Sequence, residues 1–508
     1  MGAKARHARS TWPAGGSNEL VWVQAGIVAL ALVGLLFLSW ARGVADLVPA
    51  SVCSFALVVA TCASDRLWAA AGRYSRICAI AFCVTVLLRL YFVVATSYTY
   101  MQHDTWTFDA TAGHVAYVFR LADNGLRLLD VDPTSLWSFY NPPLSYYLGA
   151  AWVCAGRIFG LADAEAAESL QWLSLAYSVG ATYVGYLVLR QARLEGRALA
   201  LGFCAWALVP FFVPLSGNVS YDGLLTLLSL ATLLLLMRWY EDPTLARALR
   251  VGVCLGLALM TKTTAVLLLL PALATFALRL TRREGRPPAA GLALQVAAVL
   301  VPAATLGGWW HVYAYLRFGM PLGYFQKVDP TDPMNCSAYS LAQRLLPSWE
   351  GDFTPFYYVD VAGDYSIPVI LLKTATFDLV GKLVPKGPLF AVGAVLDALG
   401  VALVLGAACG LVLCLPDLRS RSHEQALPIA LMASVLVSYT IGILQLSFSQ
   451  PFSCSSNFRY IVPVALAGAF FLSRLGRRRL AGRACWVCLA AYAMAQLAFW
   501  AGMGLTFG

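Results

Sequence analysis

Long apolar runs, separated by short charged clusters, follow one another along almost the whole chain. Runs of about 20 apolar residues are long enough to cross a bilayer as α-helices. We expect about 11 full spans, near residues 20–41, 46–63, 77–97, 168–189, 198–216, 222–239, 289–310, 389–415, 426–447, 459–473 and 484–506. The pattern therefore predicts an all-α polytopic membrane protein, with a basic cytoplasmic tail over 1–19 and a single transmembrane domain over 20–508.

Two further apolar segments, 142–160 and 251–278, are assigned from the distribution of basic residues. Lys and Arg are retained on the cytoplasmic side, and most of the 36 basic residues fall in alternate connections when the amino terminus is cytoplasmic. This alternation requires 142–160 to lie in the outer interface and 251–278 to form a broken helical hairpin with Thr261-Lys262-Thr263 at its tip. We thus expect interfacial helices in a first outer loop, 98–167, and a second outer loop over 311–388.

Composition changes this picture little. With 60% hydrophobic and 12% charged residues, the chain is not an ordinary soluble domain. Its net charge of +10 follows from the cytoplasmic basic clusters and does not indicate nucleic-acid binding. We expect a multi-pass protein of the plasma membrane whose large loops face outside.

The first outer loop collects acidic, imidazole and aromatic side chains directly after a hydrophobic span. Asp104, beside His103, would lie near the membrane surface, where burial and neighbours can tune the pKa of a carboxylate for general-base catalysis. An alternative interpretation is a cap for the helix expected over 109–122, and Asp109 fits that interpretation better.

Two cations in apolar surroundings are candidates for binding an anion. Lys262 is expected at the tip of the broken hairpin and Arg459 at the outer mouth of a span. Charged residues are costly in hydrocarbon and usually face a polar cavity with a partner. Arg can bind phosphate oxygens in a bidentate manner, whereas Lys acts as a point charge. The alternative is that either side chain extends to the interface or pairs with a local carboxylate.

The ordered set of motifs resembles a known family. It comprises an acidic residue in the first outer loop, an amphipathic loop helix, an aspartate after a short outer turn, and the three segments Tyr140-Asn141-Pro142-Pro143-Leu144-Ser145-Tyr146-Tyr147, Gly256-Leu257-Ala258-Leu259-Met260-Thr261-Lys262 and Arg459-Tyr460-x-x-Pro463. Over roughly residues 77–475, the chain resembles the integral membrane glycosyltransferases of the GT-C superfamily. The most similar branch is that of the protein O-mannosyltransferases and the lipid A aminoarabinose transferases.

The resemblance implies transfer of a sugar from a polyprenyl-phosphate donor, with inversion, to a glycan, lipid or protein acceptor on the outer or lumenal face. It implies that Asp104 is the catalytic base and that Asp222 is a second acidic site residue, although Asp222 also fits an N-cap. Relatives often carry His or Lys at the position of Asn141, so His114, His103 or the Tyr140 hydroxyl becomes a substitute at the donor phosphate. We expect no metal and no cofactor, because no paired metal-ligand pattern appears.

Further substrate contacts are expected from aromatic and acidic groups of both loops, namely His103, Asp109, Tyr221, Trp349, Glu350 and Tyr357, with Phe353, Phe356, Tyr358, Asp352 and Asp360 nearby. Cys336 and Cys454 are the two cysteines expected outside, so we expect a disulfide that holds the second loop beside Arg459. Two other classes of protein stay open at this point: a transporter or flippase of lipid-linked sugars, and a noncatalytic assembly subunit.

Overall fold

The computed structural model describes residues 73–281, 288–326, 328–357, 364–379, 385, 387–418 and 423–504. The chain forms two compact units, Met1–Leu87 and Leu88–Gly508. Helix α4 (Arg73–Ala95) begins in the first unit, and the features below belong to the second.

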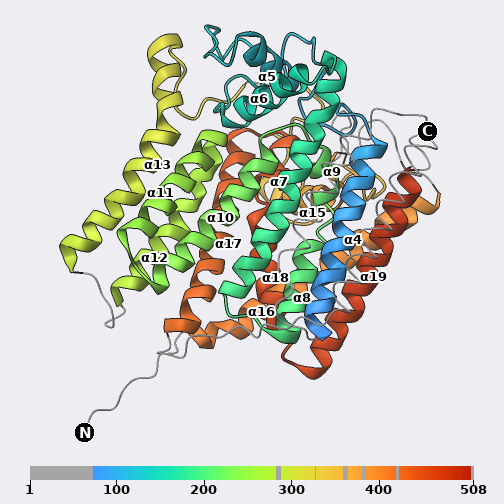
Figure 1. The fold of residues 1–508 in the computed structure, drawn as a ribbon. Coiled ribbons are helices and arrows are strands. Elements are labelled where there is room, and N and C mark those ends of the chain that lie inside the picture. Colours follow the sequence, from blue (N-terminus) through green and yellow to red (C-terminus); the bar gives the residue numbers. More distant parts are fainter. Residues whose placement is uncertain are drawn as a thin grey trace. The chain divides into compact units, whose positions relative to one another are not determined.

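In its described part, the second unit consists of helices joined by loops (Figure 1). Its helices are α5 (His114–Asp123), α6 (Leu144–Ile158), α7 (Asp163–Gln191), α8 (Gly196–Ala207), α9 (Phe212–Gly217), α10 (Asp222–Glu241), α11 (Leu245–Thr261), α12 (Leu269–Thr281), α13 (Ala289–Phe318), α14 (Leu341–Leu345), α15 (Ile367–Phe377), α16 (Pro388–Leu418), α17 (His423–Ser449), α18 (Pro463–Leu475) and α19 (Arg479–Gly504). Short 3₁₀ turns cover Thr263–Leu268, Ser453–Ser456 and Phe458–Tyr460.

Eight helices in the described residues are long and apolar enough to cross a membrane, namely Tyr74–Ala95, Asp163–Gln191, Asp222–Glu241, Thr263–Thr281, Ala290–Phe318, Pro388–Pro416, Ala426–Ser449 and Arg479–Met503. The expected spans 20–41 and 46–63 lie outside the described residues. The expected span 198–216 is instead two helices, α8 and α9, with Pro210 between them, because proline lacks the N–H that a continuous helix needs. The expected span 459–473 is shorter than predicted, since α18 begins only at Pro463.

The predicted interruption at the tip of 251–278 is present. Helix α11 ends at Thr261, Lys262 has an extended backbone with φ −161° and ψ 137°, and a 3₁₀ turn follows before α12. Because the helix is broken at this point, the Lys262 side chain can extend away from the surface of α11. Helix α6 has 15 residues and is not among the eight candidate spans in the described chain.

Close packing of α11 against α13 supports this broken element. Gly252 and Gly256 lie one helical turn apart, and a Cβ atom at Gly252 would come within 2.5 Å of the Ala298 carbonyl oxygen. At Gly256 the corresponding distance, to the Pro302 carbonyl oxygen, would be 2.7 Å. Small residues at this spacing let two helix backbones approach closely.

An aromatic cluster orders the first loop. Figure 1 shows α5 and α6 side by side beyond the end of α7. Tyr117 of α5 stacks on Phe139 and on Tyr146 of α6, each at a centroid distance of 4.3 Å. The three rings are buried, so the segments on either side of them are held in one arrangement. Asp104 lies on the segment that leads into α5.

Candidate active site

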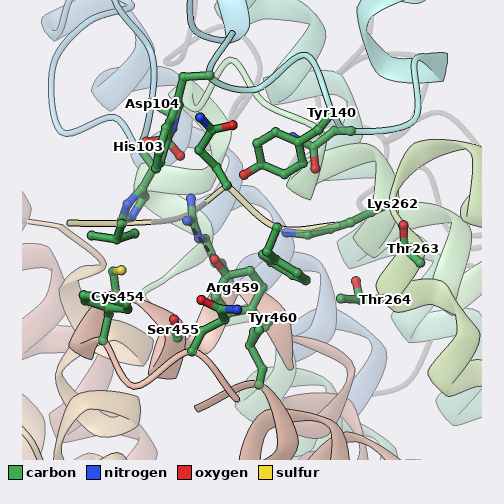
Figure 2. Close-up of a pocket in the computed structure, with 18 of the residues that line it drawn as sticks. His103, Asp104, Tyr140, Lys262, Thr263, Thr264, Cys454, Ser455, Arg459 and Tyr460 are labelled. Carbon is green, nitrogen blue, oxygen red and sulfur yellow. Dashed lines mark hydrogen bonds between the residues drawn. The ribbon is translucent and has the colours of Figure 1, made fainter. Parts of the chain in front are cut away.

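Residues from several segments that lie far apart in the sequence line one large cavity in the second unit. Its volume is about 1610 Å³, above the several hundred Å³ of an ordinary small-molecule pocket. Asp104, Tyr140, Lys262 and Arg459 all line it, and Figure 2 shows their side chains around the same space. The cavity is therefore large enough for more than one substrate group.

The two predicted cations meet at this cavity through a shared carboxylate. Lys262 Nζ lies 2.9 Å from Asp222 Oδ1, and Arg459 Nη1 lies 3.9 Å from Asp222 Oδ2. Lys262 Nζ also faces the rings of Tyr221 and Tyr460, at 4.0 and 4.4 Å from their centroids. Two cations therefore share the Asp222 carboxylate.

Arg459 is held in place but retains unused donors. Its backbone N–H donates to Asn457 Oδ1 at 2.8 Å, and Nη2 donates to the Tyr460 hydroxyl at 3.0 Å. Nε and Nη1 are buried and have no hydrogen-bond partner among the described residues. Leaving buried polar hydrogens unpaired is unfavourable, so these atoms are suited to receive an anion.

Asp222 is buried and is not among the residues that line the cavity. It is the first residue of α10, while the N-cap position belongs to Tyr221. The capping interpretation is therefore not what the structure shows. A carboxylate in the first turn is stabilised by the helix dipole, and here it serves as the counter-ion of Lys262 and Arg459.

Asp104 occupies a restrained backbone position at the cavity. Its φ is 53°, and its carbonyl oxygen accepts the His114 N–H at 2.9 Å. Gly113 lies opposite, with φ +98°, and a Cβ atom there would come within 2.8 Å of the same carbonyl oxygen. Gly113 is thus required for the approach of the Asp104 segment to the start of α5.

The residues expected to replace the basic side chain that relatives carry at the position of Asn141 lie in different environments. Tyr140 and Asn141 line the cavity, and Asn141 Nδ2 donates to the Ser138 carbonyl oxygen at 3.0 Å. His114 does not line the cavity, and its Nδ1 lies 2.8 Å from the Tyr146 hydroxyl. Burial lowers the pKa of His114 to about 4, so the ring is neutral at neutral pH and supplies no cationic charge to a phosphate.

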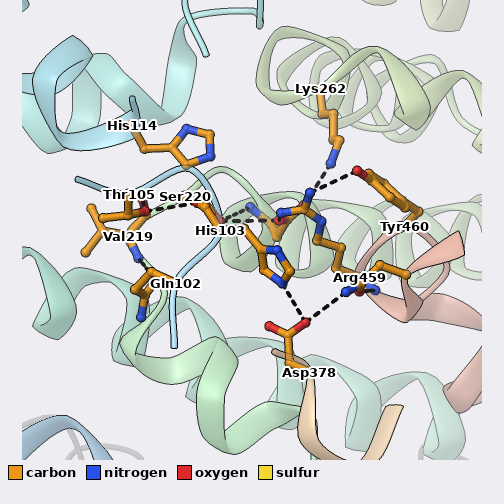
Figure 3. A network of polar contacts seen from close by, with 12 residues as sticks. Gln102, His103, Thr105, His114, Val219, Ser220, Lys262, Asp378, Arg459 and Tyr460 are labelled. Atoms are coloured by element: carbon orange, nitrogen blue, oxygen red, sulfur yellow. Dashed lines mark hydrogen bonds and ion pairs between the residues drawn. The ribbon is translucent and has the colours of Figure 1, made fainter. Parts of the chain in front are cut away.

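His103 borders the cavity but also forms a contact that the sequence analysis did not foresee. Its Nε2 lies 2.8 Å from Oδ1 of Asp378, a buried residue just after α15 (Figure 3). Asp378 stands in the second predicted loop and follows an apolar helix. No local pattern in the sequence marked it.

Several other predicted contacts lie elsewhere. Asp109 is exposed and does not line the cavity. Trp349 packs on Phe353 at 5.2 Å, and Glu350 accepts the Tyr339 hydroxyl at 3.1 Å. Tyr357 is buried, with its hydroxyl 3.0 Å from Ser453 Oγ. None of these three from the second loop lines the cavity, and Tyr358 and Asp360 fall outside the described residues.

The predicted Cys336–Cys454 disulfide is not formed, because both residues are free thiols. Cys336 Sγ lies 3.3 Å from the Met334 carbonyl oxygen, while Cys454 lines the cavity. The two segments are joined through the backbone instead, with the Ser453 N–H donating to the Met334 carbonyl oxygen at 2.8 Å. The second loop is thus held near Arg459 by backbone pairing.

Metal-ligating side chains do not gather in groups of three or more anywhere in the described part of the chain.

Comparison with known proteins finds a family similar to part of the chain. The sequence pattern of the dolichyl-phosphate-mannose-protein mannosyltransferase family matches residues 142–309, a range that includes Asp222 and Lys262. The match spans part of the chain and agrees with the resemblance inferred from the motifs.

Some solved structures also align with most of this chain at low identity. ArnT from Cupriavidus metallidurans, bound to undecaprenyl phosphate, is 14% identical with a TM-score of 0.47, over 83% of this chain and 75% of ArnT. The oligosaccharyltransferase of Archaeoglobus fulgidus, tethered with an acceptor peptide, is 12% identical with a TM-score of 0.47, over 85% of this chain and 55% of that enzyme. Curated protein sequences gave no significant match.

Proposed function

We propose that this glycosyltransferase transfers a sugar from a polyprenyl-phosphate donor to an acceptor hydroxyl or amine, with inversion and with Asp104 as general base. The observation that carries the proposal is the buried pair Lys262 and Arg459, two cations that share the Asp222 carboxylate and line the same cavity as Asp104. The matched family is named after a polyprenyl-phosphate-linked mannose. The active site would face the outside of the plasma membrane.

The donor phosphate would bind at Arg459 and Lys262. Nε and Nη1 of Arg459, which have no hydrogen-bond partner among the described residues, keep N–H donors for phosphate oxygens. Lys262 would add a point charge, and Asp222 would keep both side chains in place. These cations would stabilise the negative charge that grows on the leaving phosphate.

The polyprenyl chain would lie against an apolar wall of the same cavity. Val266 and Leu267 from the 3₁₀ turn after Lys262, and Ile443 and Leu446 from α17, line this wall. The wall adjoins Lys262, so a lipid tail there would begin at the phosphate site. Burial of each methylene group contributes about 0.8 kcal/mol, which favours a long-chain donor over a soluble sugar phosphate.

Asp104 would take the proton of the acceptor group as that group attacks the anomeric carbon. The acceptor–carbon bond forms as the carbon–oxygen bond to phosphate breaks, and the electron pair of that bond leaves with the phosphate. Proton transfer to a positioned carboxylate typically contributes about 10²–10⁴-fold to a rate. The half-buried position of Asp104 leaves its carboxylate in contact with the cavity.

The test is turnover of polyprenyl-phosphate sugars by the purified chain and by Asp104→Asn. The variant should lose roughly 10²–10⁴-fold in rate and keep its affinity for polyprenyl phosphate, because the amide retains the shape but cannot accept the proton. Asp123→Asn, at an exposed carboxylate of α5 that pairs with Arg157, is the matched control. Turnover of Asp104→Asn within a few-fold of the native rate would refute the assignment, and movement of intact donor between leaflets without transfer would indicate a flippase.

A further inference from the structure

Asp378 connects the segment that carries Asp104 with the segment that carries Arg459, and it does not line the cavity. It follows α15 and is fully buried, and its Oδ1 atom receives two polar contacts. One is His103 Nε2 at 2.8 Å, and the other is Asn457 Nδ2 at 3.0 Å. His103 precedes Asp104 in the chain, and Asn457 is two residues before Arg459. A single carboxylate oxygen therefore connects the segment of the base to the segment of the phosphate ligand.

The contact directions are defined by the chemistry of the groups. An Asn Nδ2 atom can only donate, so Oδ1 of Asp378 acts as an acceptor. The simplest arrangement is that His103 Nε2 also carries a proton and donates to this oxygen, which fixes the tautomer and the orientation of the imidazole ring. The side-chain oxygen of Asn457 also forms a hydrogen bond, since Oδ1 accepts the Arg459 N–H at 2.8 Å. The polar chain thus runs without interruption from His103 to the backbone of Arg459.

Backbone strain coincides with this connection. Asp378 has φ 55° and ψ −121°, and Asp104 has φ 53°. Side-chain-bearing residues held in such regions cost about 1–3 kcal/mol each and persist where the surroundings over-determine them. The second oxygen of Asp378, Oδ2, is buried and has no hydrogen-bond partner among the described residues. A strained residue with an unpaired buried oxygen is poorly explained by stability alone.

The end of α15 is attached to the Arg459 turn a second time. The Phe458 N–H donates to Thr374 Oγ1 at 2.9 Å, and the Asp378 N–H donates to the Thr374 carbonyl oxygen at 3.0 Å. The Arg459 turn therefore keeps the Thr374 bond to α15 when Asp378 is lost, whereas the His103 side chain reaches α15 through Asp378. Loss of Asp378 would release the base segment more than the phosphate segment.

We propose that Asp378 is a positioning residue of the transfer reaction, which acts through His103 and Asn457 to set the Asp104 carboxylate opposite the Arg459 guanidinium. The inference rests on the proposed function. A residue that does not line the cavity would then set the distance between the Asp104 carboxylate and the Arg459 guanidinium. A displacement of about 1 Å at reacting groups can lower a rate by about 10²-fold, and this is the size of effect expected when the bridge is lost.

The test compares Asp378→Ala and Asp378→Asn by kcat, KM for the donor, affinity for polyprenyl phosphate, and thermal unfolding. Asp378→Ala should lower kcat by about 10²-fold and change phosphate affinity much less, because Thr374 still holds the Arg459 turn. Asp378→Asn keeps an acceptor oxygen at Oδ1 and should restore most of the rate. His103→Ala combined with Asp378→Ala should lose no more than the more damaged single variant, since both remove the same contact. Asp130→Ala, which removes an exposed pair with Arg317, is the control that should leave kcat unchanged.

Three results would overturn the inference: native kcat in Asp378→Ala, an Asn variant as slow as the Ala variant, or a loss of rate that follows the loss of thermal stability across the set. If Asp378→Ala does not fold, His103→Ala breaks the same contact from the other side and should show the same kcat loss. An inactive Asp104→Asn together with a fully active Asp378→Ala would reject the positioning role and leave the proposed function intact. An active Asp104→Asn would reject the proposed base instead.

Discussion

Gly113 leaves no room for a side chain beside Asp104, so Gly113→Ala tests whether the position of this loop controls transfer. The added Cβ atom would lie 2.8 Å from the Asp104 carbonyl oxygen and 2.8 Å from Cε3 of Trp106. The Trp106 ring is 48% exposed and can turn away. The Asp104 carbonyl oxygen cannot, because it accepts the His114 N–H at 2.9 Å.

The magnitude follows from these contacts. A residue other than glycine at φ +98° costs roughly 1–3 kcal/mol of strain, and a lost backbone hydrogen bond costs about 1 kcal/mol. The cheaper response is a shift of the Asp104 segment. We expect a loss of thermal stability equivalent to about 1–3 kcal/mol and a fall in kcat of about 10²-fold, with affinity for polyprenyl phosphate retained because Arg459 and Lys262 are untouched.

The matched control is Gly125→Ala. Gly125 has φ +63°, and no heavy atom lies within 4 Å of a Cβ built on it. This variant meets the strain of a positive φ, about 1–2 kcal/mol, but has no contact with the Asp104 segment. Turnover of lipid-linked sugar and thermal unfolding in detergent measure both effects. A folded Gly113→Ala protein with the kcat of Gly125→Ala would show that the Asp104 position does not limit the reaction.

Three further outcomes are expected. Lys262→Met and Arg459→Met should each weaken binding of polyprenyl phosphate as well as of the donor, because the phosphate is common to both. A direct binding measurement with polyprenyl phosphate tests this. Native affinity in both variants would show that the two residues have a structural role and do not bind the phosphate. Burial lowers the pKa of His114 from 6.5 to about 4, so the unfolded chain binds more protons in that window and stability should fall as pH drops from 6.5 towards 4. This slope, followed by thermal unfolding, should be shallower in His114→Gln, and equal slopes would contradict the buried neutral ring. A cysteine at Ser135 should react with an impermeant thiol reagent from outside and one at Glu195 should not, in a background without other accessible thiols; the reverse pattern would invert the topology.

Some errors of the sequence analysis have a local cause. The span expected over 198–216 is divided at Pro210, and the span expected over 459–473 starts late, at Pro463. In both places a run of apolar side chains continued through residues that cannot continue a helix. Hydropathy measures the side chains and not the backbone, so it overestimates the length of a helix wherever proline interrupts it.

Other differences arise because aromatic and acidic residues look alike whether they pack or bind. Trp349 and Glu350 had the composition of a sugar-binding loop, yet they contact Phe353 and Tyr339. Cys336 and Cys454 were paired by elimination, and the structure joins their segments by backbone bonds instead. The direction in which a side chain points is decided by packing around it, and spacing along the chain does not contain that information.

The sequence by itself determined that this chain is a helical membrane protein, that its helix breaks at Lys262, and that its motifs resemble those of GT-C glycosyltransferases. These features follow from hydropathy, from the position of a cation in an apolar run, and from ordered motifs, all of which are local. Only the tertiary structure decided that Asp222 contacts both Lys262 and Arg459, and that Asp378 reaches both His103 and Asn457. Contacts of this kind join segments far apart in the chain, and the packing of helices such as α10, α11 and α15 sets which of those segments meet.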